Sequence, residues 1–149
     1  MAGTEDTPQN KIDALNQAFS EVNFSTEPIE NYYEFGQVLG AGKFGVVKLA
    51  TSKHNSGLKF AVKIIQLEKI KSQFHSILQE ILALKKIDHP NVVKLFEIYK
   101  DESKLYIVLE CVEGQDLYEF VVIKRKLKES EASRIIKQLG KDTWFFKIQ

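Results

Sequence analysis

Three glycines and one lysine are the residues of this sequence best suited to hold phosphate. Gly40, Gly42 and Gly45 follow the spacing G-x-G-x-x-G, in which missing side chains let backbone N–H groups approach phosphate oxygens. Lys63 follows in a run of alternating apolar residues, so its ammonium group shares a face with Ala61. The small alanine leaves room for a flat purine. These residues predict a nucleotide site whose phosphates lie near the glycines and Lys63.

The glycine spacing alone occurs in more than one kind of fold. In dinucleotide-binding folds it opens a helix and is followed by an acidic residue about 20 positions later. Here strand-like residues follow, and no Asp or Glu occurs between Gly40 and Glu68. The P-loop pattern fails because Val46, and not lysine, follows the last glycine. A glycine hairpin with a purely structural role stays open as an alternative.

Glu80 is the carboxylate that we expect to pair with Lys63. A lysine on a strand is most often a solvated surface group. Glu80, however, falls between Ile77 and Leu84 on the apolar stripe of a helix predicted over residues 68–87. Because burying an unpaired charge is costly, this glutamate needs a cation. Lys63 is the natural partner, and the pair would bring helix and strand together.

Periodicity predicts an α+β fold. Alternating apolar residues predict strands within 33–65, at 93–99 and at 105–110. The order strand, strand, strand, helix, strand, strand predicts a five-stranded antiparallel sheet with one packed helix. Two further helices are predicted around 117–123 and from Ser130, as N-cap, to Leu139.

Composition limits the partners and the setting. The chain has 149 residues, 44% of them hydrophobic, which suits one compact domain. With 21 basic and 20 acidic residues, no broad field favours nucleic acid or an anionic membrane, and we expect neither as a partner. The basic run 124–128 is interpreted as a solvated face. The single cysteine, Cys111, and the lack of a long apolar run predict a cytoplasmic protein without internal disulfides.

The two ends differ from the middle of the chain. Residues 1–31 are predicted to be an extension whose short amphipathic helix carries Ile12, Leu15, Phe19 and Val22. That helix either packs on the domain or serves as a docking or autoinhibitory segment. Thr26-Glu27-Pro28 ends it. Residues 140–149 are predicted to be a divergent tail, because their aromatic residues fit no helical face.

Taken together, these residues resemble the protein kinase family over roughly residues 33–139. The stretch Leu39-Gly40-Ala41-Gly42-Lys43-Phe44-Gly45-Val46-Val47 is similar to the family's glycine loop, Lys63 to its strand lysine and Glu80 to its helix glutamate. The resemblance implies a partial kinase domain over 32–139, made of the small lobe, the hinge and the start of the large lobe. His89-Pro90-Asn91 and the segment 105–117 look most like the calcium- and calmodulin-dependent serine/threonine group.

The resemblance also implies ATP as the ligand and a place for each part of it. An adenine slot would be walled by Leu39, Val47 and Ala61, with Leu109 at its back. The backbone of Glu110 and Val112 would bond adenine, and Asp116 would lie near the ribose. Magnesium is expected for the family.

The family's catalytic machinery is missing from these residues. Kinases transfer phosphate with a His-Arg-Asp catalytic loop and an Asp-Phe-Gly metal loop, and neither triplet occurs in this sequence. We therefore assign no catalytic residue and no metal ligand, and whether the chain is an enzyme stays open. Alone, we expect it to transfer a negligible amount of phosphate.

Three interpretations fit this mixture of features. The chain is an incomplete portion of a serine/threonine kinase, or it is a nucleotide- or partner-binding regulatory protein, or it is a phosphate-ligand module of another class. In the second case an exposed apolar surface near the C-terminus would bind a protein partner. That surface would comprise Ile135, Ile136, Leu139 and Trp144-Phe145-Phe146.

Overall fold

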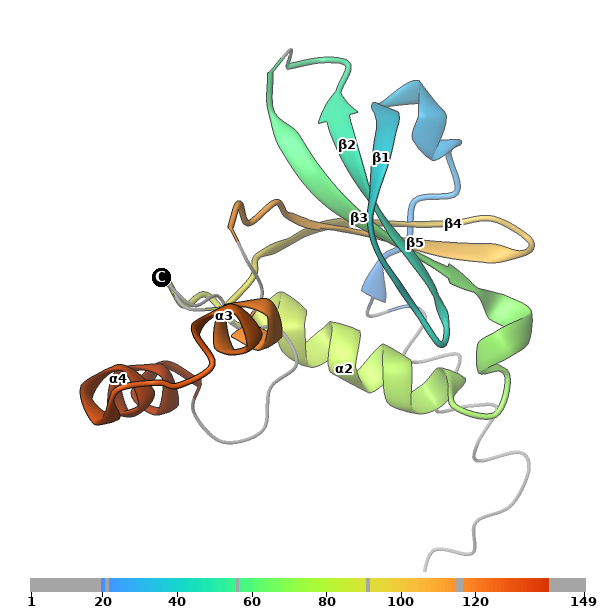
Figure 1. The fold of residues 1–149 in the computed structure, drawn as a ribbon. Coiled ribbons are helices and arrows are strands. Elements are labelled where there is room, and N and C mark those ends of the chain that lie inside the picture. The colour runs from blue at the N-terminus through green and yellow to red at the C-terminus, as the bar shows by residue number, and fades with distance from the viewer. Residues whose placement is uncertain (1–19, 21, 56, 91, 115–116, 140–149) are drawn as a thin grey trace, which may run out of the picture.

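The computed structural model describes residues 20, 22–55, 57–90, 92–114 and 117–139 (Figure 1). In chain order its elements, with η for a 3-10 helix, are η1 (Ile29–Asn31), β1 (Tyr33–Gly42), β2 (Gly45–Ser52), β3 (Lys59–Gln66), η2 (Leu67–Ile70), α2 (Phe74–Lys86), β4 (Leu95–Lys100), β5 (Lys104–Glu110), α3 (Leu117–Lys124) and α4 (Glu129–Leu139). The predicted α+β class is confirmed.

The five strands form one antiparallel sheet in the order β1-β2-β3-β5-β4. β3 lies in the middle and pairs along its length with β2 and with β5. The turn between β2 and β3 places Gly57 at a φ of 103°, a conformation that favours glycine. The predicted five-stranded sheet is therefore confirmed, although β4 begins at Leu95 and not at residue 93.

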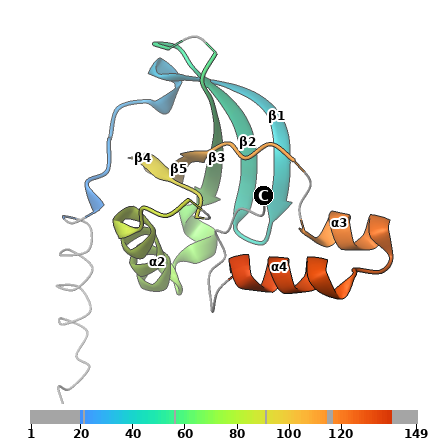
Figure 2. The ribbon, with the colours of Figure 1, turned by 90° about the vertical axis from the view of Figure 1, so that its left-hand side faces the viewer.

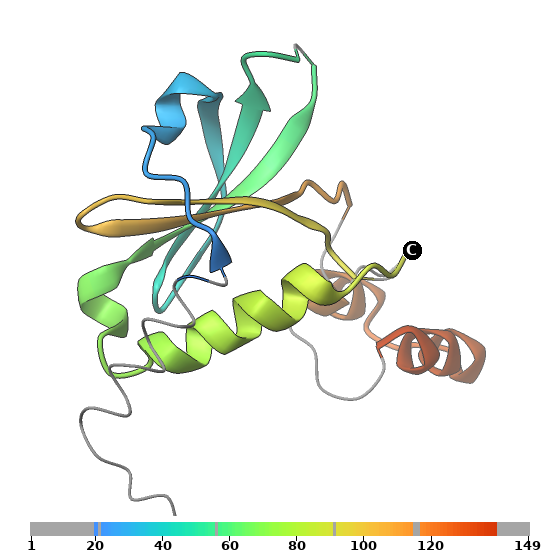
Figure 3. The ribbon, with the colours of Figure 1, turned by 180° about the vertical axis from the view of Figure 1, so that it is seen from behind.

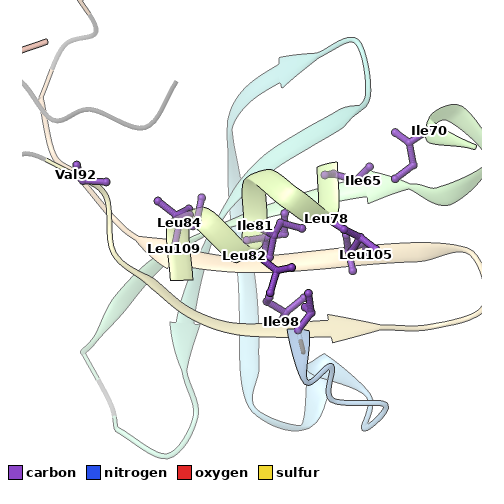
Figure 4. Packing of buried hydrophobic residues seen from close by; sticks show 12 residues of the cluster. Ile65, Ile70, Leu78, Ile81, Leu82, Leu84, Val92, Ile98, Leu105 and Leu109 are labelled. Carbon is purple, nitrogen blue, oxygen red and sulfur yellow. The ribbon is translucent and has the colours of Figure 1, made fainter. Parts of the chain in front are cut away.

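One face of the sheet packs against α2, which lies below β4 and β5 in Figure 1. The main core between them, drawn in Figure 4, joins apolar side chains of the helix to those of β3, β4 and β5. Its buried members are Val22, Ile65, Ile70, Leu78, Ile81, Leu82, Leu84, Val92, Ile98, Leu105, Ile107 and Leu109. The helix predicted over 68–87 is divided into η2 and α2, because the polar residues between them, 71–73, are exposed and gain nothing by packing.

The opposite face carries an aromatic layer. Its buried members are Ile29, Tyr33, Ala50, Val62, Tyr99, Tyr106 and Val108, with Tyr32, Phe35, Phe60 and Ile64 packed against them. Edge-to-face ring contacts join Tyr33 to Phe60, with centroids 5.4 Å apart, and Phe60 to Phe96, 5.2 Å apart. β3 thus contributes apolar side chains to the packing on both faces of the sheet.

Three buried tyrosine hydroxyls of this layer donate to carboxylates. Tyr33 and Tyr99 both donate to Glu97 Oε2, at 2.7 and 2.8 Å. Tyr106 donates to Asp101 Oδ2 at 2.9 Å, and the same carboxylate accepts the backbone N–H groups of residues 103 and 104. Burial, and then the bond to Asp101, raise the pKa of Tyr106 to about 12. Burial alone would raise the pKa of Asp101, but these hydrogen bonds hold it below its ordinary value.

The two last helices correct two predictions. α4 begins at Glu129, so Ser130 is not its N-cap; the Glu131 carboxylate instead accepts the backbone N–H of Lys128 at 3.0 Å. Ile135, predicted to be exposed, is 6% exposed. The chain turns back after α3, and α4 runs below α3 in Figure 2. None of the described helices is long and apolar enough to cross a membrane.

Only part of the predicted extension and tail can be placed. The described residues exclude Ile12, Leu15, Phe19 and the tail 140–149. The side chain of Ile136 is not described either. Ser20 and Val22 are helical, and the Val22 side chain is 1% exposed. The extension therefore packs on the domain at least through Val22.

Tyr106→Phe tests the tyrosine–carboxylate bonds. We expect the free energy of unfolding at pH 7 to fall by about 1 to 2 kcal/mol, because the variant loses a hydrogen bond to a charged acceptor. The raised pKa of Tyr106 means that its contribution is complete below an ordinary tyrosine pKa of about 10 and is lost as the pH rises through about 12. Urea titrations near pH 10 and near pH 12 should show that the free energy of unfolding falls less in the variant than in the wild type. Identical losses in variant and wild type would contradict this account.

Candidate nucleotide-binding site

The strand register gathers four of the predicted site residues on one face of the sheet. Val47 of β2 lies opposite Lys63 of β3, and Ala61 of β3 lies opposite Leu109 of β5. Directly opposed residues project to the same face with Cβ atoms roughly 5 Å apart. Since Ala61 and Leu109 belong to the main core side, this is the face that α2 partly covers. The shared face predicted for Ala61 and Lys63 is confirmed.

The glycine loop is the turn between β1 and β2. Gly40 pairs with Val47 and Gly42 with Gly45, which leaves Lys43 and Phe44 at the tip. A Cβ on Gly45 would lie 1.8 Å from the carbonyl oxygen of Ile64, so close approach to β3 requires this glycine. A Cβ on Gly40 or Gly42 would meet nothing within 4 Å. Packing thus explains Gly45 but not the other two.

The tip of the loop leans onto the face that carries Lys63. The Phe44 ring packs against the main core, and its carbonyl oxygen accepts the backbone N–H of Gln66 at 3.2 Å. The Lys43 ammonium lies 5.2 Å from the centre of the Phe44 ring. Ala41 and Val46 face each other across the loop and complete the predicted stretch.

A cavity of about 430 Å³ opens where β1 meets the segment after β5. Two predicted adenine contacts, Leu39 and Val112, line it, and each is 46% exposed. Val47, Ala61 and Leu109 are not among its lining residues. Sequence reasoning did not identify Gln37, Leu49, Lys59 and Glu113, which also line it; no motif marks them. A larger cavity of about 780 Å³ lies elsewhere, between η2, the start of α2 and the β4–β5 turn.

Glu110 ends β5, and Cys111 begins the segment that follows it. The backbone N–H of Glu110 donates to the Lys94 carbonyl at 2.8 Å, and its carboxylate accepts the Lys94 N–H at 3.2 Å. Cys111 is half-buried in the cavity wall, and burial raises the pKa of its thiol, which disfavours the reactive thiolate. Asp116, the predicted ribose contact, lies outside the described residues.

Glu80 does not lie where helical spacing predicted it. Its side chain is exposed, and no ion pair between described residues joins it to Lys63, which is half-buried. The reason is that α2 also buries Leu78 and Leu82. These two leucines turn the apolar face of the helix away from Glu80. The predicted burial of Glu80 is wrong, and this structure does not contain the predicted pair.

The described residues do not fit a metal ion. Among residues 20, 22–55, 57–90, 92–114 and 117–139, no three His, Cys, Asp or Glu side chains gather in a group that could hold one. Magnesium prefers several oxygen ligands in near-octahedral geometry. No chemical step of this chain is therefore assigned to a metal.

A five-stranded sheet packed on one helix, with a glycine loop and a strand lysine on the same face, is the architecture of a kinase small lobe. The family model described as protein kinase domain matches residues 33–142. The chain belongs to the protein kinase family.

The most similar sequences and structures include serine/threonine kinases. "Calcium/calmodulin-dependent protein kinase type 1" of Caenorhabditis briggsae is 40% identical over 114 residues, 76% of this chain. "Calcium-dependent protein kinase 5" of Plasmodium falciparum is 35% identical over 146 residues, 93% of this chain. The crystal structure of Rad53 1-466 in complex with AMP-PNP superimposes with a TM-score of 0.67 and 32% identity over 86% of this chain. The chain spans 32%, 25% and 32% of these three proteins, respectively.

Substitution of the glycines by alanine separates their two roles. Gly45→Ala should destabilise the fold by about 1 to 3 kcal/mol, because the new Cβ forces β2 and β3 apart. Gly42→Ala is the matched control within the same loop and should change the free energy of unfolding by less than about 0.5 kcal/mol. Urea unfolding of both variants provides the measurement. Equal destabilisation would show that Gly42 has an unrecognised packing role.

Proposed function

We propose that this chain binds ATP as the small-lobe part of a serine/threonine protein kinase domain spanning residues 32–139. One observation carries the proposal: Lys63 shares a sheet face with Ala61 and Val47, beside a loop whose Gly40 and Gly42 have no packing reason to be glycine. Unobstructed backbone N–H groups and a nearby ammonium group bind phosphate oxygens well. Membership of the kinase family supports the same ligand.

One end of this sheet face would hold the adenine of ATP, and the other end would hold its phosphates. The cavity lined by Leu39 and Val112 offers exposed apolar side chains to adenine. Leu109 does not line this cavity, but it lies opposite Ala61 on the same face of the sheet. The phosphates would lie along the loop toward Lys63. One of the related solved structures is a complex with AMP-PNP, and we propose a similar ligand here.

Catalysis by this chain alone is not part of the proposal. In protein kinases the strand lysine must pair with the helix glutamate, and two loops hold the metal and the catalytic aspartate. Here Glu80 is exposed, and among the described residues no ion pair joins it to Lys63. The sequence contains neither His-Arg-Asp nor Asp-Phe-Gly. These observations support nucleotide binding by the described residues and do not support phosphate transfer by this chain alone.

A partner-binding role is the second candidate, and one observation favours it. Three consecutive apolar side chains of α3, those of Val121, Val122 and Ile123, are 37%, 54% and 65% exposed. Exposed apolar patches mark protein interaction surfaces. This surface differs from the predicted one, since Ile135 is buried. Nucleotide binding and partner binding are compatible, because α3 lies away from the glycine loop in Figure 1.

Lys63→Met tests the ATP proposal by isothermal titration calorimetry, with and without magnesium. We expect at least a tenfold loss of affinity, because the variant removes the cation beside the phosphates. Lys48→Met is the matched control: Lys48 lies opposite Val62, so it belongs to the aromatic face. It should bind ATP like the wild type. Wild-type affinity in Lys63→Met, or equal losses in both variants, would refute the proposed site.

Phosphate transfer gives an independent test. The chain incubated with labelled ATP and a generic protein substrate should incorporate no more label than its Lys63→Met variant, because general-base and metal assistance are both missing. A general base alone contributes about 10² to 10⁴ in rate. Incorporation clearly above that of the variant would contradict the expectation.

A further inference from the structure

A short segment, residues 22–25, covers one edge of the sheet. β4 is the last strand on this side. The backbone N–H of Ser25 donates to the carbonyl of Ile98 at 2.9 Å, and the N–H of Lys100 donates to the carbonyl of Ser25 at 2.9 Å. Ser25 thus forms a parallel bridge with Tyr99 of β4, and Figure 3 shows this blue segment crossing the strand. The segment therefore occupies backbone groups that an edge strand would otherwise present to another extended chain.

Apolar side chains anchor the chain on both sides of this bridge. Before it, Val22 is 1% exposed in the main core, and Phe24 packs against the same core. The Lys85 ammonium also donates to the Val22 carbonyl at 3.1 Å. After it, Ile29 is 2% exposed in the aromatic layer on the opposite face of the sheet. The chain thus passes from one face of the sheet to the other around the edge of β4, with Ser25 paired to that edge.

The residues of β4 suit pairing with β4 of a second copy of this chain. Ile98 and Lys100 direct backbone groups outward, toward Ser25. Two such strands related by a twofold axis could pair antiparallel about Ile98. This register would set Lys100 opposite Phe96 of the second copy, and Glu97 opposite Tyr99. No like charges would face each other, and Phe96, now 46% exposed, would gain a neighbour.

We propose that residues 22–25 are an edge guard, which prevents β4 from pairing with β4 of a second copy of this chain. Ser25 and the second copy compete for the same Ile98 carbonyl and Lys100 N–H, so the two pairings exclude each other. Release of the guard favours a symmetric dimer in which one sheet continues through both copies. The proposal does not depend on nucleotide binding.

Two guard variants and one control test the proposal without nucleotide. Ser25→Pro removes the N–H that bonds to Ile98, and Val22→Ala removes most of the buried anchor. Thr26→Pro is the matched control: Thr26 is exposed, and its backbone N–H donates to none of the described residues. Analytical ultracentrifugation measures the dimer dissociation constant. Hydrogen exchange of the Lys100 amide, in dilute and in concentrated samples, reports whether the edge of β4 is covered.

Both guard variants should dimerise with a dissociation constant at least tenfold below that of the wild type and of Thr26→Pro. Their Lys100 amide should exchange faster than that of the wild type in dilute samples. It should slow again in concentrated samples, because the N–H then bonds to the second copy. Unchanged exchange in dilute samples of both guard variants would overturn the role of Ser25.

Three other results would also overturn the proposal. One is faster exchange without stronger dimerisation. Another is equally strong dimerisation of Thr26→Pro. The third is dimerisation that leaves the Lys100 amide exchanging fast, which would assign the contact between copies to another surface, such as the exposed apolar side chains of α3.

Discussion

The register of β3 is the constraint on which the rest of the structure depends. β3 pairs with β2 and β5 along its length, and successive side chains point to opposite faces. A slip of one residue would move Lys63 to the aromatic face and bring Val62 to the other. Two features oppose such a slip: Val62 and Ile65 are buried on opposite faces, and Gly45 touches the Ile64 backbone too closely for any other residue. The register that places Lys63 on the nucleotide face is therefore fixed by packing contacts made elsewhere along β3.

The same packing explains why part of that face is left open. Among the described residues, the buried members of the main core come from α2, β3, β4, β5 and nearby segments, and only Phe44 from the loop joins β1 and β2 to it. α2 thus covers one half of the sheet and leaves the glycine loop and Leu39 uncovered. The aromatic layer packs on the far side of the sheet, where the bond from Tyr33 to Glu97 joins β1 to β4.

The sequence predicted those features that depend on local spacing. Alternation identified the strands and the shared face of Ala61 and Lys63, and the glycine loop stood out by its spacing alone. The predicted burial of Glu80 was wrong because the prediction used the apolar stripe through Ile77 and Leu84 and left out the equally apolar Leu78 and Leu82. Where the apolar arc of a helix is wide, only the opposing strands decide which part is buried.

Two other features left no readable signal in the sequence. Ser25 pairs with β4 through backbone groups, which every residue possesses, so nothing in its side chain predicts the strand edge as its partner. Ile135 is buried, and helical spacing alone does not determine which neighbour covers an apolar side chain. The pairing of Ser25 with β4 and the burial of Ile135 therefore required the structure, which also shows the Lys85 ammonium of α2 bonded to the Val22 carbonyl.

The most direct test of the central claim is a titration of the ¹⁵N-labelled chain with ATP, followed by two-dimensional NMR. The account predicts that the amide signals of Gly40, Gly42 and Val112 shift together with one saturating dissociation constant. The amides of Ser103 and Lys104, at the larger cavity by the β4–β5 turn, should stay in place. Shifts concentrated at that turn, or glycine signals that do not move at millimolar ATP, would contradict the claim that this face of the sheet holds the nucleotide.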